Sequence, residues 1–224
     1  MENIRVIRAG IVEHHVMAEV MKGIQQQRIA EEVPDTLILV EHPEVVTIGP
    51  KAVREGVEVD GYPTVLTDRG GGITWHGPGQ LVAYPIFKWV TREQSIRAII
   101  GRLEDWAISA FADCGIEAYK DLSMQGAWVD GHKICSIGLS FLHWVSRHGM
   151  SINICTPGTR VEDLEGCGMM AGVHSSLAQL GYTHDPTGRP IDMSRMEGAL
   201  LETCEQHLGR APMDPIEWSL ETVA

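Results

Sequence analysis

The sequence lacks a hydrophobic run that approaches the 18 residues of a membrane-spanning helix, and its first ten residues hold no signal-peptide core. Positive charge is also scarce, because 18 lysines and arginines face 30 aspartates and glutamates, for a net charge of −12. These two deficits argue against a membrane partner and a nucleic-acid partner. We therefore predict a cytoplasmic protein.

A disulfide framework is absent as well, since the five cysteines are odd in number and irregularly spaced. No Cys-x-x-Cys pair supports a zinc site built from Cys155, Cys167 and His174, and we predict no metal. The sequence shows no internal repeat, low-complexity tract or interdomain linker. A chain of 224 residues with 44% hydrophobic and 21% charged residues suits one domain, 1–224.

Hydrophobic periodicity predicts strands in the middle of the chain and helices around them. Asp130–Gly131 has the composition of a two-residue hairpin turn that needs positive φ. Together these patterns predict an α/β fold with a mixed β-sheet core and flanking helices. The predicted helices are 12–28, 93–112 and 191–208, followed by a tail over 209–224, and the predicted strands are 3–8, 36–40, 45–49, 65–67, 81–86, 116–119, 127–129, 132–140, 144–145 and 150–154.

Two histidines fall at the start of the first predicted helix. His14 and His15 are adjacent, and adjacent helix positions do not face one another, so we interpret both as surface residues. His42 follows a predicted strand, where it either caps a turn or belongs to a site.

The segment 68–85 is the strongest candidate for a site. Gly70, Gly71 and Gly72 let the backbone approach a ligand closely, and Arg69 places a fixed cation beside them. His76 begins a second turn, Gly77–Pro78–Gly79. A single glycine-rich turn is typical of a hairpin loop, whereas two adjacent turns that carry arginine and histidine favour a binding site.

Lys133 is unusual for its place in a predicted strand. It shares a face with Cys135, Ile137 and Leu139, which point toward the core. Burial lowers the pKa of an ammonium group. The alternative is that the side chain extends along the strand to reach water.

Cys167 differs from the other four cysteines, which fall at a helix end, on strands or in a helix stripe. Gly166 and Gly168 flank it in a loop, where the sulfur is exposed and backbone N–H groups are free to face an oxyanion. On these residues alone the cysteine is either incidental or a nucleophile.

The segment 69–85, Arg-Gly-Gly-Gly-Ile-Thr-Trp-His-Gly-Pro-Gly-Gln-Leu-Val-Ala-Tyr-Pro, resembles the signature of octanoyltransferases, and 131–138 resembles the segment that carries their catalytic lysine. The resemblance runs from about Thr36 to about Leu177 and implies the fold of biotin and lipoate protein ligases. This family moves an octanoyl group from acyl carrier protein to a lysine of lipoyl domains. The sequence departs from the pattern at Pro50, at Gly166, at Ser175 and over 155–165.

The resemblance implies catalysis by a dyad of Cys167 and Lys133, without a cofactor. His76 would either orient this pair or contact the thioester carbonyl. The implied substrate-binding residues are Arg69, Gly70, Gly71, Gly72, Gly77, Pro78, Gly79, Gln80, Tyr84, Ser136, Ile137, Gly138, His148, Gly149 and Asn153.

The implied partners are octanoyl-acyl carrier protein as donor and, as acceptors, the lipoyl domains of 2-oxoacid dehydrogenase E2 subunits or the glycine cleavage H protein. Both are typically acidic, so an acidic chain needs a locally basic rim to receive them. Two alternatives remain open: an ATP-dependent lipoate or biotin protein ligase, and a noncatalytic acyl-binding protein on the same scaffold.

Overall fold

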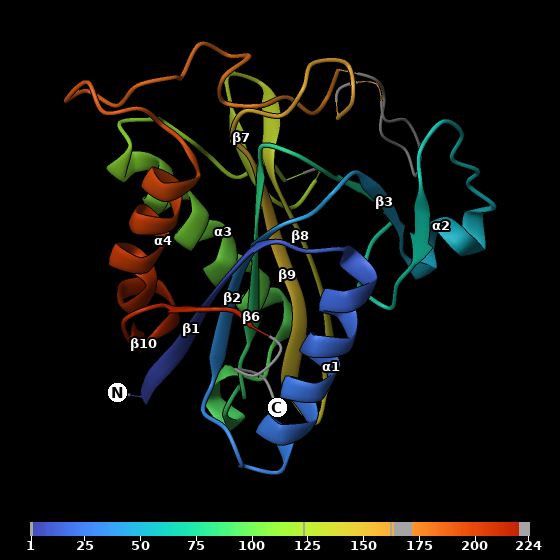
Figure 1. The fold of residues 1–224 in the computed structure, drawn as a ribbon, viewed down its shortest axis with the longest axis vertical. Helices are drawn as coiled ribbons and strands as arrows, with labels where there is room; N and C mark the ends of the chain where they lie inside the picture. The colour runs from blue at the N-terminus through green and yellow to red at the C-terminus, as the bar shows by residue number, and fades with distance from the viewer. Residues whose placement is uncertain (1, 123, 162, 164–171, 220–224) are drawn as a thin grey trace.

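The computed structural model describes residues 2–122, 124–161, 163 and 172–219, and it is built on one large mixed β-sheet (Figure 1). The strand order is β10-β1-β2-β6-β9-β8-β7, and β11 also pairs with β1. β1 runs parallel to β2, β10 and β11, and the remaining pairs are antiparallel. The strands are β1 (Glu2–Ile11), β2 (Thr36–Glu41), β6 (Gln80–Ile86), β7 (Ala127–Val129), β8 (His132–Leu142), β9 (Val145–Asn153), β10 (Arg210–Pro212) and β11 (Ile216–Glu217).

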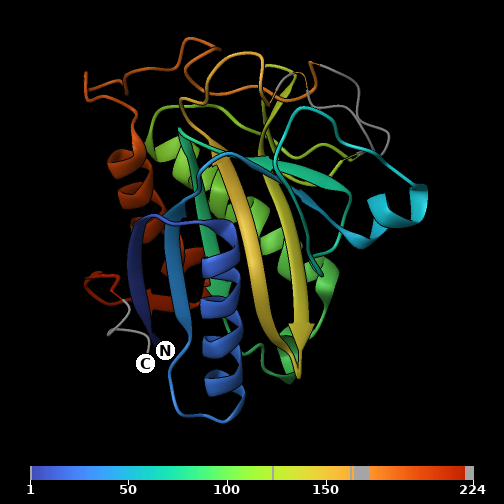
Figure 2. The same cartoon turned by 45° about the vertical axis from the view of Figure 1, so that its right-hand side comes forward.

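Helices cover both faces of this sheet, which confirms the predicted α/β architecture (Figures 1 and 2). α1 (His14–Ile29) packs on one face through Met17, Met21 and Ile24. α3 (Ile96–Asp113) and α4 (Met193–Leu208) pack on the other. Each buries one hydrophobic stripe, as the helical period of the sequence requires. Within the described residues, no helix combines the length and hydrophobicity needed to cross a membrane.

A second, smaller sheet lies beside the large one and carries the glycine-rich segment. Its strand order is β4 (Thr64–Leu66), β3 (Val45–Ile48) and β5 (Ile73–His76). α2 (Pro50–Glu55), which the sequence patterns did not predict, follows β3, and a short 3-10 helix, η1 (Thr91–Glu93), precedes α3. Arg69 to Gly72 lie in the connection between β4 and β5. This loop contacts the large sheet, because the Gly70 N–H donates to the Leu139 carbonyl of β8.

The structure confirms the predicted turn at 130–131, whereas the strand predicted over 116–119 and the tail predicted over 209–224 differ from what is observed. Asp130 and Gly131 have φ of +49° and +81° between β7 and β8, as the hairpin prediction requires. The strand predicted over 116–119 is reduced to one bridge from Tyr119 to Trp128. The predicted C-terminal tail instead contributes β10 and β11, because the edge of β1 offers unpaired backbone groups.

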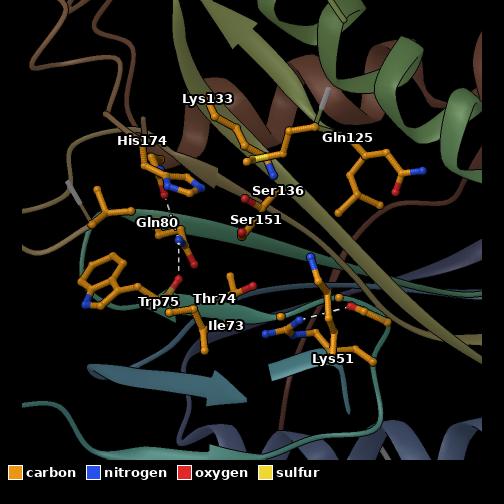
Figure 3. A pocket seen from close by; sticks show the side chains of 18 of the residues that line it. Lys51, Ile73, Thr74, Trp75, Gln80, Gln125, Lys133, Ser136, Ser151 and His174 are labelled. Atoms are coloured by element: carbon orange, nitrogen blue, oxygen red, sulfur yellow. Dashed lines mark hydrogen bonds between the residues drawn. The ribbon is translucent and has the colours of Figure 1, made fainter. Parts of the chain in front are cut away.

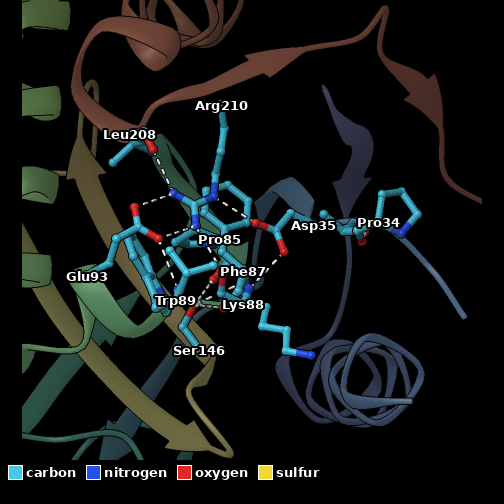
Figure 4. Close-up of polar contacts among 12 residues, drawn as sticks. Pro34, Asp35, Pro85, Phe87, Lys88, Trp89, Glu93, Ser146, Leu208 and Arg210 are labelled. Carbon is cyan, nitrogen blue, oxygen red and sulfur yellow. Dashed lines mark hydrogen bonds and ion pairs between the residues drawn. The ribbon is translucent and has the colours of Figure 1, made fainter. Parts of the chain in front are cut away.

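Arg210 explains why the chain after α4 is held in place (Figure 4). Its Nε donates to Asp35 Oδ2 at 2.7 Å, and Nη1 donates to the Leu208 carbonyl at 2.7 Å. Nη2 donates to Glu93 Oε2 at 3.2 Å, and the guanidinium lies 4.6 Å from the centre of the Trp89 ring. The buried guanidinium of Arg210 therefore joins β10 to the residue before β2 and to η1, which precedes α3.

Arg210→Met is expected to lower the free energy of unfolding by about 2–3 kcal/mol, because it removes the cation shared by the buried Asp35 and the half-buried Glu93. Arg28 and Arg102 keep one ion pair to each carboxylate, which limits the loss. Urea denaturation followed by circular dichroism measures the change. Arg97→Met, which removes an exposed arginine from α3, is the matched control and should change stability by less than about 1 kcal/mol. Equal losses in the two variants would contradict the assigned role of Arg210.

Candidate active site

A cavity of about 630 Å³ opens between the small sheet and the ends of β8 and β9 (Figure 3). In Figure 3, Lys133 and His174 extend from its upper wall and Lys51 from its lower wall. The described residues that line it are Lys51, Arg69, Gly70, Gly71, Gly72, Ile73, Thr74, Trp75, Gln80, Leu122, Met124, Gln125, Lys133, Ser136, Ile137, Ser151, Asn153, Val161 and His174.

Lys133 lies in the second position of β8 and is only 7% exposed, so its amine reaches the cavity and not bulk water. The backbone N–H of Lys133 donates to the Val173 carbonyl at 2.8 Å, and this contact brings His174 beside Lys133. Burial is the main reason that the pKa of the Lys133 amine falls to about 8, and the nearby Arg69 lowers it further. A substantial fraction of this amine is therefore neutral near physiological pH.

Arg69 is buried and fixed by the small sheet. Its Nη2 donates to the Thr47 carbonyl and to Thr47 Oγ1, each at 2.8 Å. The next residue, Gly70, donates its N–H to the Leu139 carbonyl of β8 at 2.8 Å. A Cβ at Gly138 would stand 2.9 Å from the Gly70 carbonyl oxygen, so the loop and β8 approach as closely as glycine allows.

A chain of side-chain hydrogen bonds runs behind the cavity from His76 to the segment that holds His174. Gln80 Nε2 donates to Asn153 Oδ1 at 2.8 Å and to the Trp75 carbonyl at 2.9 Å, which leaves Gln80 Oε1 to accept from His76 Nδ1–H at 2.7 Å. Asn153 in turn donates to the Ser175 carbonyl at 2.9 Å. Burial holds the pKa of His76 well below its ordinary value, so the ring is neutral and positions its neighbours.

The structure corrects the interpretation of His14 as a surface residue. His14 is 4% exposed, and its ring centre lies 5.2 Å from that of His42 and 5.9 Å from that of His76. His42 Nδ1–H donates to the Val12 carbonyl at 2.6 Å, and its Nε2 accepts from the Tyr84 hydroxyl at 2.8 Å. Three imidazoles, from α1, from β5 and from the residue that follows β2, therefore share one buried cluster. His15, by contrast, is exposed as predicted.

Two members of this histidine cluster (His14, His42 and His76), His14 and His76, line a second, smaller cavity. This cavity shares Arg69, Thr74, Ser136, Ile137 and Ser151 with the first. Burial lowers the pKa of His14 to about 3 and that of His42 to about 4. Within the described part of the chain, no group of three or more His, Cys, Asp or Glu side chains is arranged to hold a metal ion.

The structure divides the predicted site residues into four groups. Arg69, Gly70, Gly71, Gly72, Gln80, Lys133, Ser136, Ile137 and Asn153 line the large cavity. His76, Tyr84, Gly138, His148 and Gly149 line the small one. Gly77, Pro78 and Gly79 line neither. Cys167 lies outside the described residues.

The turn 77–79, whose residues the family resemblance implies to be substrate-binding, is held in place by backbone packing. The Gly79 carbonyl accepts from the N–H groups of Ile154 and Cys155, each at 3.0 Å. A Cβ at Gly79 would stand 2.3 Å from the Cys155 carbonyl oxygen. The glycine thus allows close packing of the turn against the end of β9, and the prediction that this turn contacts the substrate stays a prediction.

The sequence patterns missed several lining residues, of which His174 matters most because it flanks Lys133. Burial lowers the pKa of His174 to about 4, with a further contribution from the Lys133 charge. A histidine seven positions after Cys167 was the available signal, and it was considered only as a zinc ligand. Ser151 and Lys51 gave no distinctive signal, because their neighbours across the cavity are distant in sequence.

The cavity is electrostatically positive even though the chain is acidic. Its charged lining residues are Lys51, Arg69 and Lys133, and no aspartate or glutamate lines it within the part of the chain that the structure describes. A thiolate or a tetrahedral oxyanion is stabilised by such a lining.

The fold and this site define a family. Residues 15–204 match the lipoyl protein ligase A/B catalytic domain, and the chain belongs to that family. Curated relatives are named octanoyltransferase. That of Mycolicibacterium gilvum is 36% identical over 91% of this chain and 87% of its own, and that of Magnetococcus marinus is 39% identical over 77% and 78%. The octanoyltransferase resemblance found in the sequence is confirmed.

Solved structures show the same fold at low sequence identity. Lipoate-protein ligase A bound with ATP has a TM-score of 0.73 at 13% identity and covers 100% of this chain and 92% of its own. Biotin protein ligase from Aquifex aeolicus has a TM-score of 0.51 at 11% identity and covers 93% of this chain and 69% of its own. The predicted biotin and lipoate protein ligase fold is therefore confirmed.

Proposed function

We propose that this chain transfers an octanoyl group from acyl carrier protein, through a thioester on Cys167, to the lysine of a lipoyl domain. The observation that carries the proposal is the buried amine of Lys133, whose pKa lies near 8 in a cavity with a positive lining. The names of the relatives support the acyl group and the reaction type.

The path of the chain supports Cys167 as the nucleophile. Val161 and His174 both line the cavity that holds Lys133. Cys167 stands six residues after the first and seven before the second in the sequence. Described residues on both sides of the segment that contains Cys167 therefore lie at the cavity wall.

In the proposed first step, the Cys167 thiolate attacks the thioester carbonyl of octanoyl-acyl carrier protein. The new carbon–sulfur bond forms, the old one breaks, and the Lys133 ammonium gives a proton to the departing phosphopantetheine thiolate. In the second step, the neutral Lys133 amine takes a proton from the incoming lysine. That lysine attacks the acyl-cysteine, an amide forms, and the Cys167 thiolate is regenerated.

The acceptors we propose are lipoyl domains of 2-oxoacid dehydrogenase E2 subunits or the glycine cleavage H protein. Their acidic surfaces would meet the cations at the cavity. Lys51 on α2 lies at the cavity with its side chain 49% exposed, so it offers a positive charge at the mouth.

Intact-mass spectrometry after incubation with octanoyl-acyl carrier protein tests the proposal. We expect one octanoyl adduct that maps to Cys167, is released by hydroxylamine, and disappears in Cys167→Ser. Cys155→Ser is the matched control, because it removes another exposed cysteine. The pKa of the Cys155 thiol is raised by partial burial of the sulfur and by the nearby Glu41 carboxylate, so Cys155 is a poor nucleophile and this variant should keep the adduct.

The same experiment separates the alternatives. An ATP-dependent ligase would form no adduct with octanoyl-acyl carrier protein but would consume ATP with free octanoate or lipoate. A noncatalytic acyl-binding protein would do neither. Either result, obtained with folded wild-type protein, would overturn the thioester route.

A further inference from the structure

Glu104 is a charged residue on the buried face of α3. It is 8% exposed and is next in sequence to Leu103, which is fully buried; Trp106 and Ala107 on the same helix are also fully buried. A carboxylate in such surroundings loses hydration, and this cost must be offset by specific partners. The partners of Glu104 therefore indicate why it is there.

Its main partner is the backbone of the segment before β7. Glu104 Oε1 accepts from the Gly126 N–H at 2.9 Å. Its other oxygen lies 3.8 Å from Lys120 Nζ, but Lys120 is closer to Asp105, at 2.8 Å. The buried carboxylate is thus committed chiefly to Gly126.

Gly126 in turn packs against Lys133. Its φ is +135°, and a Cβ there would stand 2.8 Å from Lys133 Cε and 2.1 Å from the Cys135 carbonyl oxygen. The backbone at Gly126 therefore touches the carbon that bears the Lys133 amine. Met124 and Gln125, just before it, line the same cavity.

The charges around Lys133 make Glu104 electrostatically important too. Arg69 from the glycine-rich loop disfavours the ammonium form of Lys133. His174 beside Lys133 has a pKa of about 4, so it is neutral near pH 7 and offers no charge that would stabilise the ammonium. Cys135 on the same face of β8 has a thiol pKa raised to about 12 by burial, so it is neutral near pH 7. Within the described residues that act on Lys133, the carboxylate of Glu104 remains as the anion that favours its charged form.

We propose that Glu104 is a positioning residue for Lys133: it clamps Gly126 against the side chain and holds the amine partly protonated inside a positive cavity. Its importance for acyl transfer rests on the proposed function, but its effect on Lys133 does not.

Competitive labelling with acetic anhydride at a series of pH values measures the titration of Lys133 directly, through the extent of acetylation of its peptide in mass spectrometry. In Glu104→Gln the amide oxygen still accepts from Gly126, but the charge is gone. We expect the Lys133 midpoint to move toward acid by about half a pH unit. The midpoint of Lys51, an internal reference on α2, should stay unchanged.

Asp105→Asn is the matched control, because Asp105 is the next residue on α3 and pairs with the same Lys120 without contacting Gly126. Its Lys133 midpoint should stay at the wild-type value. Glu104→Ala, which also removes the clamp, should shift the midpoint as Glu104→Gln does and in addition accelerate acetylation of Lys133 above its midpoint at least several-fold.

The pH profile of octanoyl transfer provides the link to catalysis. In Glu104→Gln, the limb assigned to Lys133 should shift toward acid by the same amount as the labelling midpoint. An unchanged labelling midpoint in folded Glu104→Gln would overturn the proposal. If the Lys133 midpoint shifts in Glu104→Gln but folded wild-type protein forms no octanoyl adduct, the proposed function is overturned and the role of Glu104 stands.

Discussion

Lys133→Met is expected to lower octanoyl transfer by about 10²–10⁴-fold while the protein remains folded. Methionine has a similar length and suits a site between Cys135 and Gly126, so the backbone need not move. The loss follows from removal of the group that both protonates the leaving thiolate and deprotonates the incoming lysine. A gel-shift assay of lipoyl-domain octanoylation measures the effect.

Lys133→Arg separates the two parts of this role. An arginine keeps the positive charge beside the nucleophile but does not release its proton near neutral pH. We therefore expect it to form the acyl-cysteine and to fail in transfer to the acceptor amine, so that the octanoyl adduct accumulates. Lys22→Met, which removes an exposed lysine on α1, is the control and should transfer at the wild-type rate.

The wild-type pH profile carries the same signature. Because the pKa of Lys133 is about 8, the neutral amine required in the second step increases as pH rises from 7 to 9. Transfer from the acyl-enzyme should rise with it and then level off. Normal turnover by Lys133→Met would contradict the assignment of Lys133 as the base. A wild-type rate of transfer from the acyl-enzyme that stays constant from pH 7 to 9 would contradict it as well.

The second large effect is loss of stability between about pH 6.5 and 4. His14, His42 and His174 have folded-state pKa values of about 3, 4 and 4, whereas unfolded histidine titrates near 6.5. Below pH 6.5 the unfolded chain binds protons that the folded chain rejects, so the free energy of unfolding falls with pH. Each histidine contributes about 1.4 kcal/mol per pH unit, or about 4 kcal/mol per unit for the three.

Burial also lowers the pKa values of His76 and His148, so both histidines add to the loss in this window. Carboxylates titrate at lower pH or in the opposite sense. Asp68 has a pKa lowered mainly by the hydrogen bond from His148, so its stabilisation is lost only below the ordinary carboxylate range. Glu41 and Glu197, whose pKa values burial raises, offset part of the loss just above that range. The window from pH 6.5 to 5 therefore reports chiefly on the histidines.

Urea denaturation midpoints at pH 7.5, 6.5, 5.5 and 5 measure this loss. His14→Phe should reduce the slope of stability against pH, since it removes one titrating group from the unfolded chain and keeps a ring in the cluster. His15→Gln alters the exposed neighbour on α1 and is the control. A midpoint that stays constant from pH 7.5 to 5 would refute neutral burial of the cluster.

The comparison of His14 with Lys133 shows what a linear sequence can predict. Lys133 was identified because strand alternation places it on the same face as Cys135 and Ile137, which is a local relation. His14 was misread because its partners, His42 and His76, are 28 and 62 positions away. A helix pattern reports which face is buried only when that face is uniformly apolar, and a histidine on the buried face breaks the pattern.

The sequence by itself determined the helix stripes, the Asp130–Gly131 turn and the glycines that allow close backbone approach, because each depends on neighbours within a few residues. It also determined the family, through the long segment 69–85. Only the tertiary structure decided that Gly79 packs against Cys155, that three histidines share one buried cluster, and that Glu104 reaches the backbone beside Lys133. These features depend on which surfaces meet when the two sheets and α3 pack together, and burial then sets the charge state of each group.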